Sequence, residues 1–187
     1  MLVIGTKLQG LKLIEPSVHE DHRGFFFESY SEEKFHEHGI EIKFIQDNHS
    51  LSVEAGVVRG LHYQISPRAQ SKLVRVTAGA IYDVAADIRV GSPTYGNWQG
   101  FILSASNKRQ LLIPSGFAHG FCTLVPGTEV QYKVDEFYAP KYDRGILWSD
   151  PALGIDWPVT SPILSEKDAR LPYLADAENN FLFTKGE

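Results

Sequence analysis

Cysteine is almost absent from this chain: Cys122 is the only one in 187 residues, so no internal disulfide can form. A lone thiol is typical of proteins in a reducing compartment, and we expect a cytoplasmic location. Cys122 lies within an apolar run, which predicts a small buried hydrophobic side chain rather than a reactive thiol.

Long apolar runs and basic clusters are missing as well. No stretch approaches the length of a membrane-spanning helix, and residues 1–6 become polar too early for a signal peptide. The formal net charge is −5, and no group of basic residues suggests a nucleic-acid surface. We therefore expect a soluble protein with neither a membrane nor a nucleic-acid partner.

Short apolar runs broken by Gly, Pro and Asn dominate the sequence, and this pattern predicts an all-β sandwich or barrel. Residues 77–80, between two of these runs, are predicted to form a hairpin turn. The expected strands are 11–18, 25–30, 44–50, 57–64, 72–76, 80–87, 98–103, 110–113, 120–124 and 129–137.

Helical signals are few. Ser31 is a candidate N-cap for a helix that ends at Gly39, and Ser165 precedes a second short segment. The Pro-rich segment 151–187 is predicted to be an arm that packs back onto a barrel core at about 10–150. No linker or repeat divides the chain, so residues 1–187 are expected to form one domain.

Two segments resemble the paired motifs of cupin barrels: Gly56-Val57-Val58-Arg59-Gly60-Leu61-His62-Tyr63-Gln64 and Pro114-Ser115-Gly116-Phe117-Ala118-His119. Metal-binding cupins use three histidines and a glutamate, but Gln64 replaces one histidine here. Only His62 and His119 remain, and two imidazoles are a poor ligand set for Zn, Fe or Mn. The resemblance implies a cupin-like jelly-roll barrel with a few short helices, and we expect no metal and no cofactor.

A narrower resemblance covers nearly the whole chain. An ordered set of motifs is similar to the dTDP-4-dehydrorhamnose 3,5-epimerase family. It implies conversion of dTDP-4-dehydro-6-deoxy-D-glucose to dTDP-4-dehydro-L-rhamnose, by proton removal at C3 and C5 and return from the opposite face. The family is dimeric, so a homodimer is expected. The motifs are His22-Arg23-Gly24-Phe25-Phe26-Phe27-Glu28, Gln46-Asp47-Asn48-His49-Ser50, Arg59-Gly60-Leu61-His62-Tyr63-Gln64, Lys72-Leu73-Val74, Pro114-Ser115-Gly116-Phe117-Ala118-His119-Gly120-Phe121 and Tyr132.

This reaction requires a base, an acid on the opposite side and a group that stabilises the enolate. His62 is the candidate base, because the pKa of a free imidazole is close to neutral pH. Asp168 matches the family's partner carboxylate, although its position after Ser165 also fits a helix cap. Tyr132 is the candidate acid; the alternative is a core tyrosine with a tethered hydroxyl.

Lys72 lies on the same strand face as Val74 and Val76, and an unpaired charge on such an apolar face is costly to bury. An enolate oxygen is a fitting partner for the Lys72 ammonium; the alternative is a lysine side chain that extends to water.

His119 is expected to donate a hydrogen bond to the sugar or its keto oxygen, unless it is purely structural.

The remaining candidates suit a nucleotide diphosphate. Arginines bind phosphate oxygens, and a ring with amides and a carboxylate can contact thymine and sugar. In a regular strand Arg59 and His62 point to opposite faces, so both can line one pocket only if Gly60 allows a bulge. The candidates for substrate binding are Arg23, Phe26, Glu28, Gln46, Asn48, Arg59, His119, Tyr138 and Lys167.

Three other functions stay open. A close relative would epimerise a single carbon or use a related dTDP-4-keto-deoxysugar. A metal-dependent cupin enzyme would need bound metal. A binding module without catalysis would keep Arg23 and Arg59 but would not need His62, Lys72 and Tyr132 together.

Overall fold

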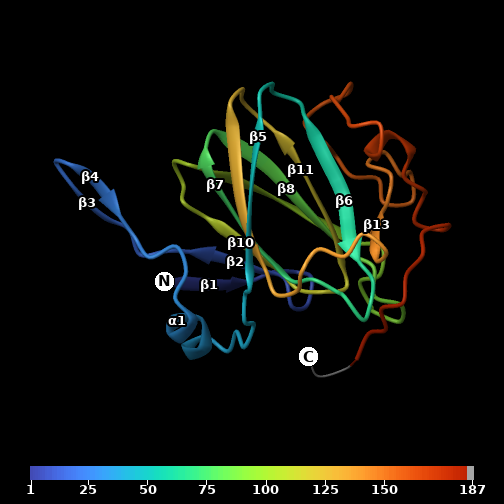
Figure 1. Cartoon of the computed structure of the whole chain (residues 1–187), viewed down its shortest axis with the longest axis horizontal. Coiled ribbons are helices and arrows are strands. Elements are labelled where there is room, and N and C mark those ends of the chain that lie inside the picture. The colour runs from blue at the N-terminus through green and yellow to red at the C-terminus, as the bar shows by residue number, and fades with distance from the viewer. Residues whose placement is uncertain (185–187) are drawn as a thin grey trace.

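Antiparallel β-sheets form the framework of the structure, a computed structural model that describes residues 1–184 (Figure 1). The larger sheet has six strands, and every neighbouring pair in it is antiparallel. Its order is β1 (Leu2–Gly5), β2 (Lys12–Glu15), β10 (Gln110–Ile113), β7 (Lys72–Ala78), β12 (Thr128–Val134) and β5 (Gln46–Ser52).

The second sheet packs against the first and has five antiparallel strands. The two sheets together form the cupin-like jelly-roll barrel that the sequence predicts. The order in this sheet is β13 (Asp143–Gly145), β6 (Val58–Gln64), β11 (Phe117–Thr123), β8 (Ala80–Asp87) and β9 (Trp98–Ser104).

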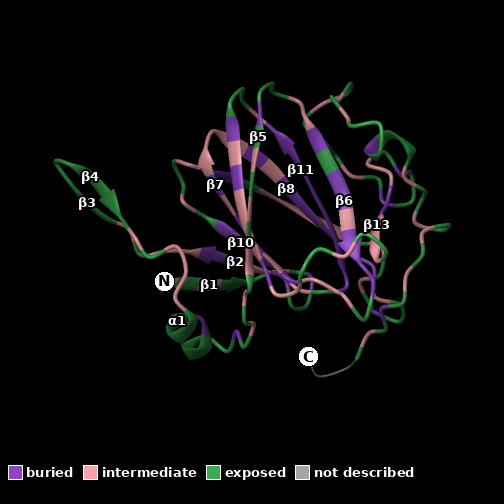
Figure 2. Ribbon diagram, viewed as in Figure 1, coloured by how far each residue is buried: buried purple, intermediate pink, exposed green. Residues whose placement is uncertain are grey.

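Three apolar layers follow from the alternation of side chains along these strands. The central layer fills the barrel, with Val74 and Val130 from one sheet facing Ile81 and Phe121 from the other. A second layer lies between the five-stranded sheet and the C-terminal arm, and a third lies between the six-stranded sheet and α1. Figure 2 shows the buried residues concentrated on the barrel strands.

Helix α1 (Glu32–Glu37) confirms the predicted N-cap, because the Oγ of Ser31 accepts from the backbone N–H of Lys34. The preceding strands, β3 (His19–Asp21) and β4 (Gly24–Phe26), form a separate exposed hairpin that projects from the barrel (Figures 1 and 2). The predicted strand 25–30 is therefore mostly wrong: pairing ends at Phe26, and this hairpin contributes to neither barrel sheet.

The predicted hairpin at 77–80 is also wrong. Strands β7 and β8 follow each other directly, but they belong to different sheets. Gly79 has a φ of +75°, and a Cβ there would meet Oγ1 of Thr128 at 2.3 Å. This glycine lets the chain turn sharply from one sheet to the other.

The C-terminal arm covers the outer face of the five-stranded sheet with side chains such as Trp157 and Phe181. The last three residues of the predicted arm 151–187 lie outside the described residues. Within the arm, η1 (Asp168–Arg170) is a short 3-10 turn. Cys122 is buried beneath the arm, as predicted, and burial raises the pKa of its thiol to about 11.

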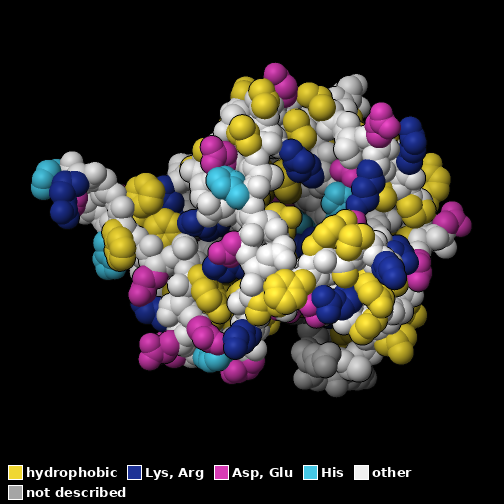
Figure 3. All heavy atoms as spheres, viewed as in Figure 1, with side chains coloured by type: hydrophobic (Ala, Val, Ile, Leu, Met, Phe, Trp, Pro, Cys, Tyr) yellow, Lys and Arg dark blue, Asp and Glu magenta, His cyan; other side chains and the backbone are white. Residues whose placement is uncertain are grey.

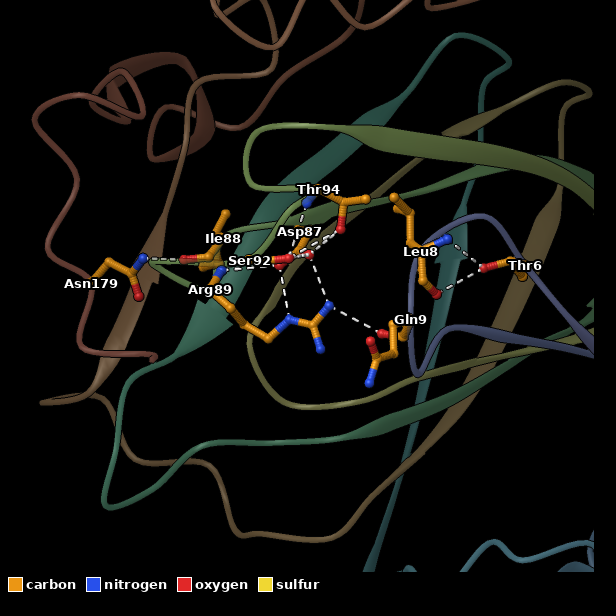
Figure 4. A network of polar contacts seen from close by, with 9 residues as sticks. All are labelled: Thr6, Leu8, Gln9, Asp87, Ile88, Arg89, Ser92, Thr94 and Asn179. Atoms are coloured by element: carbon orange, nitrogen blue, oxygen red, sulfur yellow. Dashed lines mark hydrogen bonds and ion pairs between the residues drawn. The ribbon is translucent and has the colours of Figure 1, made fainter. Parts of the chain in front are cut away.

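A buried polar network fastens the barrel end near this arm (Figure 4). The carboxylate of Asp87 accepts from the guanidinium of Arg89 and from the hydroxyls of Ser92 and Thr94. Asn179 of the arm donates to the backbone carbonyl of Ile88. These hydrogen bonds satisfy buried polar groups at this end of the barrel and add to the apolar contacts of the arm.

Candidate active site

Two adjoining cavities open into the barrel between its sheets. One has a volume of about 660 Å³ and the other about 410 Å³. Both are lined by His62, Lys72, Tyr132 and Lys167, so they meet at these side chains. Figure 3 shows this face of the molecule hollowed near its centre, with basic and histidine side chains around the hollow.

Strand β6 carries Arg59 and His62, and both side chains line the larger cavity. The pairing with β11 is irregular here: His119 lies opposite His62, and Phe121 lies opposite Arg59. Strand β6 therefore has one more residue than β11 in this interval, which is the bulge that the sequence requires. Gly60 has a φ of +120°, and a Cβ there would lie 2.6 Å from Cα of Gly120.

His62 is paired with a carboxylate from the C-terminal arm. Its Nε2 lies 2.7 Å from Oδ1 of Asp168, whose side chain is 5% exposed. The Oγ of Ser165 accepts from the backbone N–H of Asp168, and Gly60 N–H donates to the Asp168 carboxylate. Burial raises the pKa of Asp168, but these hydrogen bonds and the charge of His62 outweigh it and leave the pKa below its ordinary value.

The Asp168 side chain is thus directed to His62, and the alternative that Asp168 only caps a helix is wrong. The capping contact at this turn comes from the Oγ of Ser165 instead. A carboxylate can only accept, so Nε2 of His62 carries the proton of this hydrogen bond. In the neutral form of the ring, the lone pair is then on the other nitrogen, Nδ1.

Lys72 begins strand β7 on the barrel's inner face, and its Nζ donates to the backbone carbonyl of His62 at 3.4 Å. Burial lowers the pKa of Lys72 to about 8, while the charges of Asp143 and Asp83 act in the opposite direction. A desolvated ammonium of this kind is well suited to stabilise negative charge that develops beside it.

Tyr132 comes from the six-stranded sheet, whereas His62 comes from the five-stranded sheet. Its register opposite Val74 and Asn48 places it on the inner face. Burial raises the pKa of the Tyr132 phenol, so the hydroxyl keeps its proton at neutral pH. A tyrosine and an imidazole thus approach the same space from opposite walls.

His119 lies directly across from His62 and is hydrogen-bonded to a buried carboxylate, with its Nε2 2.6 Å from Oδ1 of Asp83. Burial lowers the pKa of His119, and the nearby charges of Lys72 and His62 add to this effect. The sequence prediction missed Asp83. The signal was its position between Ile81 and Ala85 on the inner face, where a charged residue is as unusual as Lys72.

The smaller cavity contains a polar group suited to a base or sugar. Gln46 and Asn48 are joined by a hydrogen bond of 2.9 Å. Asp143 accepts from the Tyr138 hydroxyl at 3.1 Å and from Nζ of Lys167 at 2.5 Å. Asp143, at the start of strand β13, was also missed, because no periodic pattern in the sequence indicates a strand or a site there.

Arg23, Phe26 and Glu28 line neither of these cavities. They belong to the projecting hairpin and the segment after it, where the side chain of Arg23 is 79% exposed and pairs with Asp21. The structure thus brings the other predicted site residues together but leaves these three apart from them in this chain.

In residues 1–184, no three His, Cys, Asp or Glu side chains gather in an arrangement that could hold a metal ion. The same part of the chain has no helix long and apolar enough to cross a membrane.

The fold and the cavity define the chain as a cupin-like barrel enzyme. The sequence model of the dTDP-4-dehydrorhamnose 3,5-epimerase family matches residues 5–176. The enzyme of that name from Shigella flexneri is 52% identical over 179 residues, which cover 95% of this chain and 98% of the relative. The chain belongs to the dTDP-4-dehydrorhamnose 3,5-epimerase family, whose members are isomerases.

Two solved structures are similar to this one. The dTDP-4-dehydrorhamnose 3,5-epimerase from Bacillus anthracis str. Ames, with TDP and PPi bound, has a TM-score of 0.91 and 57% identity, covering 92% of this chain and 98% of that one. The dTDP-6-deoxy-D-glucose-3,5-epimerase from Legionella pneumophila Philadelphia 1, in complex with dTDP-4-keto-L-rhamnose, has a TM-score of 0.89 and 49% identity, covering 93% of each chain.

Proposed function

We propose that this enzyme converts dTDP-4-dehydro-6-deoxy-D-glucose to dTDP-4-dehydro-L-rhamnose by inverting C3 and C5. The observation that carries the proposal is the placement of His62 and Tyr132 on facing sheets of one cavity. Epimerisation needs proton removal from one face of a carbon and proton return to the other. The similarity to structures with TDP and with dTDP-4-keto-L-rhamnose supports the substrate class.

His62 acts as the base through Nδ1, because Nε2 is committed to Asp168. The carboxylate orients the ring and stabilises the imidazolium that forms when the proton is taken up. The proton leaves a carbon next to the ketone, and the electron pair moves onto the keto oxygen to give an enolate.

Lys72 stabilises that enolate oxygen with its ammonium group. Tyr132 then donates its phenolic proton to the same carbon from the opposite face. Tyr132 regains a proton from solvent, and His62 releases the proton that it took up to solvent, which restores the base. The cycle repeats at the second carbon. No step draws on a metal or another cofactor.

Arg59, His119, Gln46, Asn48, Tyr138 and Lys167 bind the substrate from within the same protomer. Arg59 is held by Ser52 Oγ and by the carbonyl of Leu51, which fixes its guanidinium at the cavity edge. Asp143 joins this group through Tyr138 and Lys167. Since the C-terminal arm supplies Asp168 and Lys167, barrel and arm act as one domain.

The enzyme is a homodimer in which the projecting hairpin of one protomer completes the cavity of the other. Phe25 and Phe26 are 57% and 68% exposed, which is unusual for aromatic rings on a free surface. A partner cavity would cover these rings and would place Arg23 near the phosphates. The single reduced cysteine and the nucleotide-sugar substrate support a cytoplasmic location.

The test is incubation with dTDP-4-dehydro-6-deoxy-D-glucose in deuterated water, with and without chelator, followed by NMR at C3 and C5. Deuterium at both carbons and formation of the L-rhamno product, both abolished in His62→Ala, would support the proposal. Exchange at one carbon would reduce the activity to single-site epimerisation. Loss of activity with chelator would instead support a metal-dependent cupin enzyme, and no exchange with folded protein would overturn the assignment.

A further inference from the structure

The cavity wall contains a second imidazole–carboxylate pair besides His62 and Asp168. His62, His119 and Asp83 lie on three adjacent strands, β6, β11 and β8. His119 lies opposite His62, and Asp83 lies opposite Phe121, two residues along from His119. Residues two apart share a strand face, so all three side chains are directed into the barrel.

The two pairs differ in how they meet the cavity. The His62 side chain is 30% exposed, whereas those of His119 and Asp83 are 8% and 0% exposed. His119 lines the larger cavity, but Asp83 does not, so Asp83 lies behind the imidazole. Asp83 therefore acts on a substrate only through His119.

The hydrogen bond fixes which ring nitrogen of His119 carries a proton. The carboxylate of Asp83 has no proton to give, so Nε2–H of His119 donates to it across 2.6 Å. A second proton on Nδ1 would make a cation. Burial opposes that cation most strongly, and the Asp83 carboxylate favours it. The charges of Lys72 and His62, the other titratable groups that face this ring, oppose it, and the balance leaves the pKa of His119 below its ordinary value. Nδ1 is then a hydrogen-bond acceptor.

The two cationic side chains that line this cavity near His119 supply no hydrogen-bond acceptor. The ammonium of Lys72 and the guanidinium of Arg59 can donate hydrogen bonds but cannot accept them. A sugar hydroxyl bound between such groups must still place its own proton on an acceptor, because an unpaired buried hydroxyl weakens binding.

We propose that Asp83 is a positioning residue, which fixes His119 in the tautomer whose Nδ1 accepts a hydrogen bond from a substrate hydroxyl. The substrate part of this inference rests on the proposed epimerase function; the tautomer does not. This proposal differs from the role expected from the sequence, in which His119 donates a hydrogen bond to the sugar or its keto oxygen. Here His119 accepts a hydrogen bond from a hydroxyl, and Lys72 contacts the keto oxygen.

The tautomer can be measured in the wild-type protein without substrate. The protein is labelled with 15N-histidine, and the His119 signals are assigned by their loss in His119→Gln. At neutral pH we expect a neutral ring with its proton on Nε2. A proton on Nδ1, alone or together with Nε2, would overturn the proposal whether or not the enzyme is an epimerase.

Asp83→Asn gives the matching functional test. The Asn amide can donate to Nε2, which reverses the tautomer and places a proton on Nδ1, much as Asp-to-Asn does in a Ser-His-Asp triad. We expect a reversed 15N pattern and a KM raised about tenfold, which corresponds to one lost hydrogen bond, with a smaller change in kcat. Unchanged KM with a reversed tautomer, or an unchanged tautomer, would contradict the proposal.

Asp87→Asn is the control, because it makes the same change at another buried carboxylate of strand β8. Asp87 contacts Arg89, Ser92 and Thr94 but no residue of the cavity (Figure 4). We expect this variant to be less stable but to keep the His119 15N pattern and KM. If wild-type protein shows the expected tautomer but no exchange with the sugar nucleotide, the proposed function fails while the assignment of Asp83 and His119 stands.

Discussion

His62 and Asp168 are 106 residues apart in the chain, yet Nε2 of the imidazole lies 2.7 Å from Oδ1 of the carboxylate. Asp168→Asn would keep the shape of the side chain but present an N–H to Nε2, so that the ring proton moves to Nδ1. The proposed base then has no lone pair toward the substrate. We expect kcat to fall about 10³–10⁴-fold, as in other imidazole–carboxylate pairs.

Steady-state kinetics and the rate of deuterium incorporation would measure this loss. Glu166→Gln is the matched control, since it changes a neighbouring carboxylate whose side chain is 91% exposed. The control should keep wild-type rates. If Asp168→Asn lost less than tenfold, the carboxylate would serve the arm rather than the base.

Tyr132→Phe removes the proposed acid but leaves the base in place. Proton removal by His62 does not need the phenol, so deuterium should still enter the starting sugar. Inversion requires a proton from the opposite wall and should fall about 10²–10⁴-fold. NMR that follows exchange and product separately would detect the difference; equal loss of both would contradict the assigned role.

Lys72 is expected to set the alkaline limit of the proposed reaction. Its pKa is lowered by burial to about 8, so the ammonium is present below this pH and is lost above it. The raised pKa of Tyr132 keeps the phenol protonated through the same range. We therefore expect kcat/KM to decline as pH rises through about 8.

Lys72→Arg should move this decline to higher pH, because a guanidinium keeps its charge. Lys133→Arg is the control: Lys133 pairs with Asp47 and lines neither cavity of the site, so the decline should stay near pH 8. If the decline at alkaline pH did not move in Lys72→Arg, the decline would have to come from the titration of another group.

The alternation of apolar residues predicted the barrel and most of its strands, because side-chain period follows directly from strand geometry. It could not assign strands to sheets. Gly79 looks like a hairpin glycine in the sequence, and only the sheet assignment of β7 and β8 shows that it turns the chain between sheets. The pairing partners of a strand depend on contacts that are distant in the sequence.

Some residues of the candidate site could likewise be predicted from the sequence, and others could not. His62, Lys72 and Tyr132 could be predicted, because each is a chemically distinctive residue in a motif or on an apolar face. Asp143 could not, since its partners Tyr138 and Lys167 are brought to it by the fold. For Arg23 and Phe26 the sequence indicates substrate binding, but a single protomer holds no contact that explains it.

Gly60 is predicted to tolerate no side chain. In Gly60→Ala the new Cβ would lie 2.6 Å from Cα of Gly120 and 2.7 Å from the carbonyl oxygen of His119, at a φ of +120°. We expect a loss of about 1–3 kcal/mol in the free energy of unfolding from the strained φ alone, and lower activity because the bulge positions Arg59 and His62. Urea unfolding would measure the loss.

Gly5→Ala is the control for that variant, since a Cβ at Gly5 meets nothing within 4 Å. It should change the unfolding free energy by no more than about 0.5 kcal/mol. A stable, active Gly60→Ala protein would mean that the backbone at the bulge can relax without disturbing the site.

A composite active site predicts complementation between two inactive proteins. Arg23→Ala/Phe26→Ala should disable the hairpin, and His62→Ala should disable the base. In a mixed dimer one cavity receives both defects, while the other combines an intact base with an intact hairpin. With random exchange of subunits about half of the dimers are mixed, so about a quarter of wild-type activity should return.

The measurement is activity after the two inactive proteins are unfolded together and refolded, with differently tagged chains to count mixed dimers. Each protein treated alone is the control and should stay inactive. If the hairpin served its own protomer, every cavity of a mixed dimer would carry one defect, and no activity would return. Mixed dimers without activity would therefore place Arg23 and Phe26 in the site of their own chain. If no dimers formed at all, the proposed homodimer would be wrong.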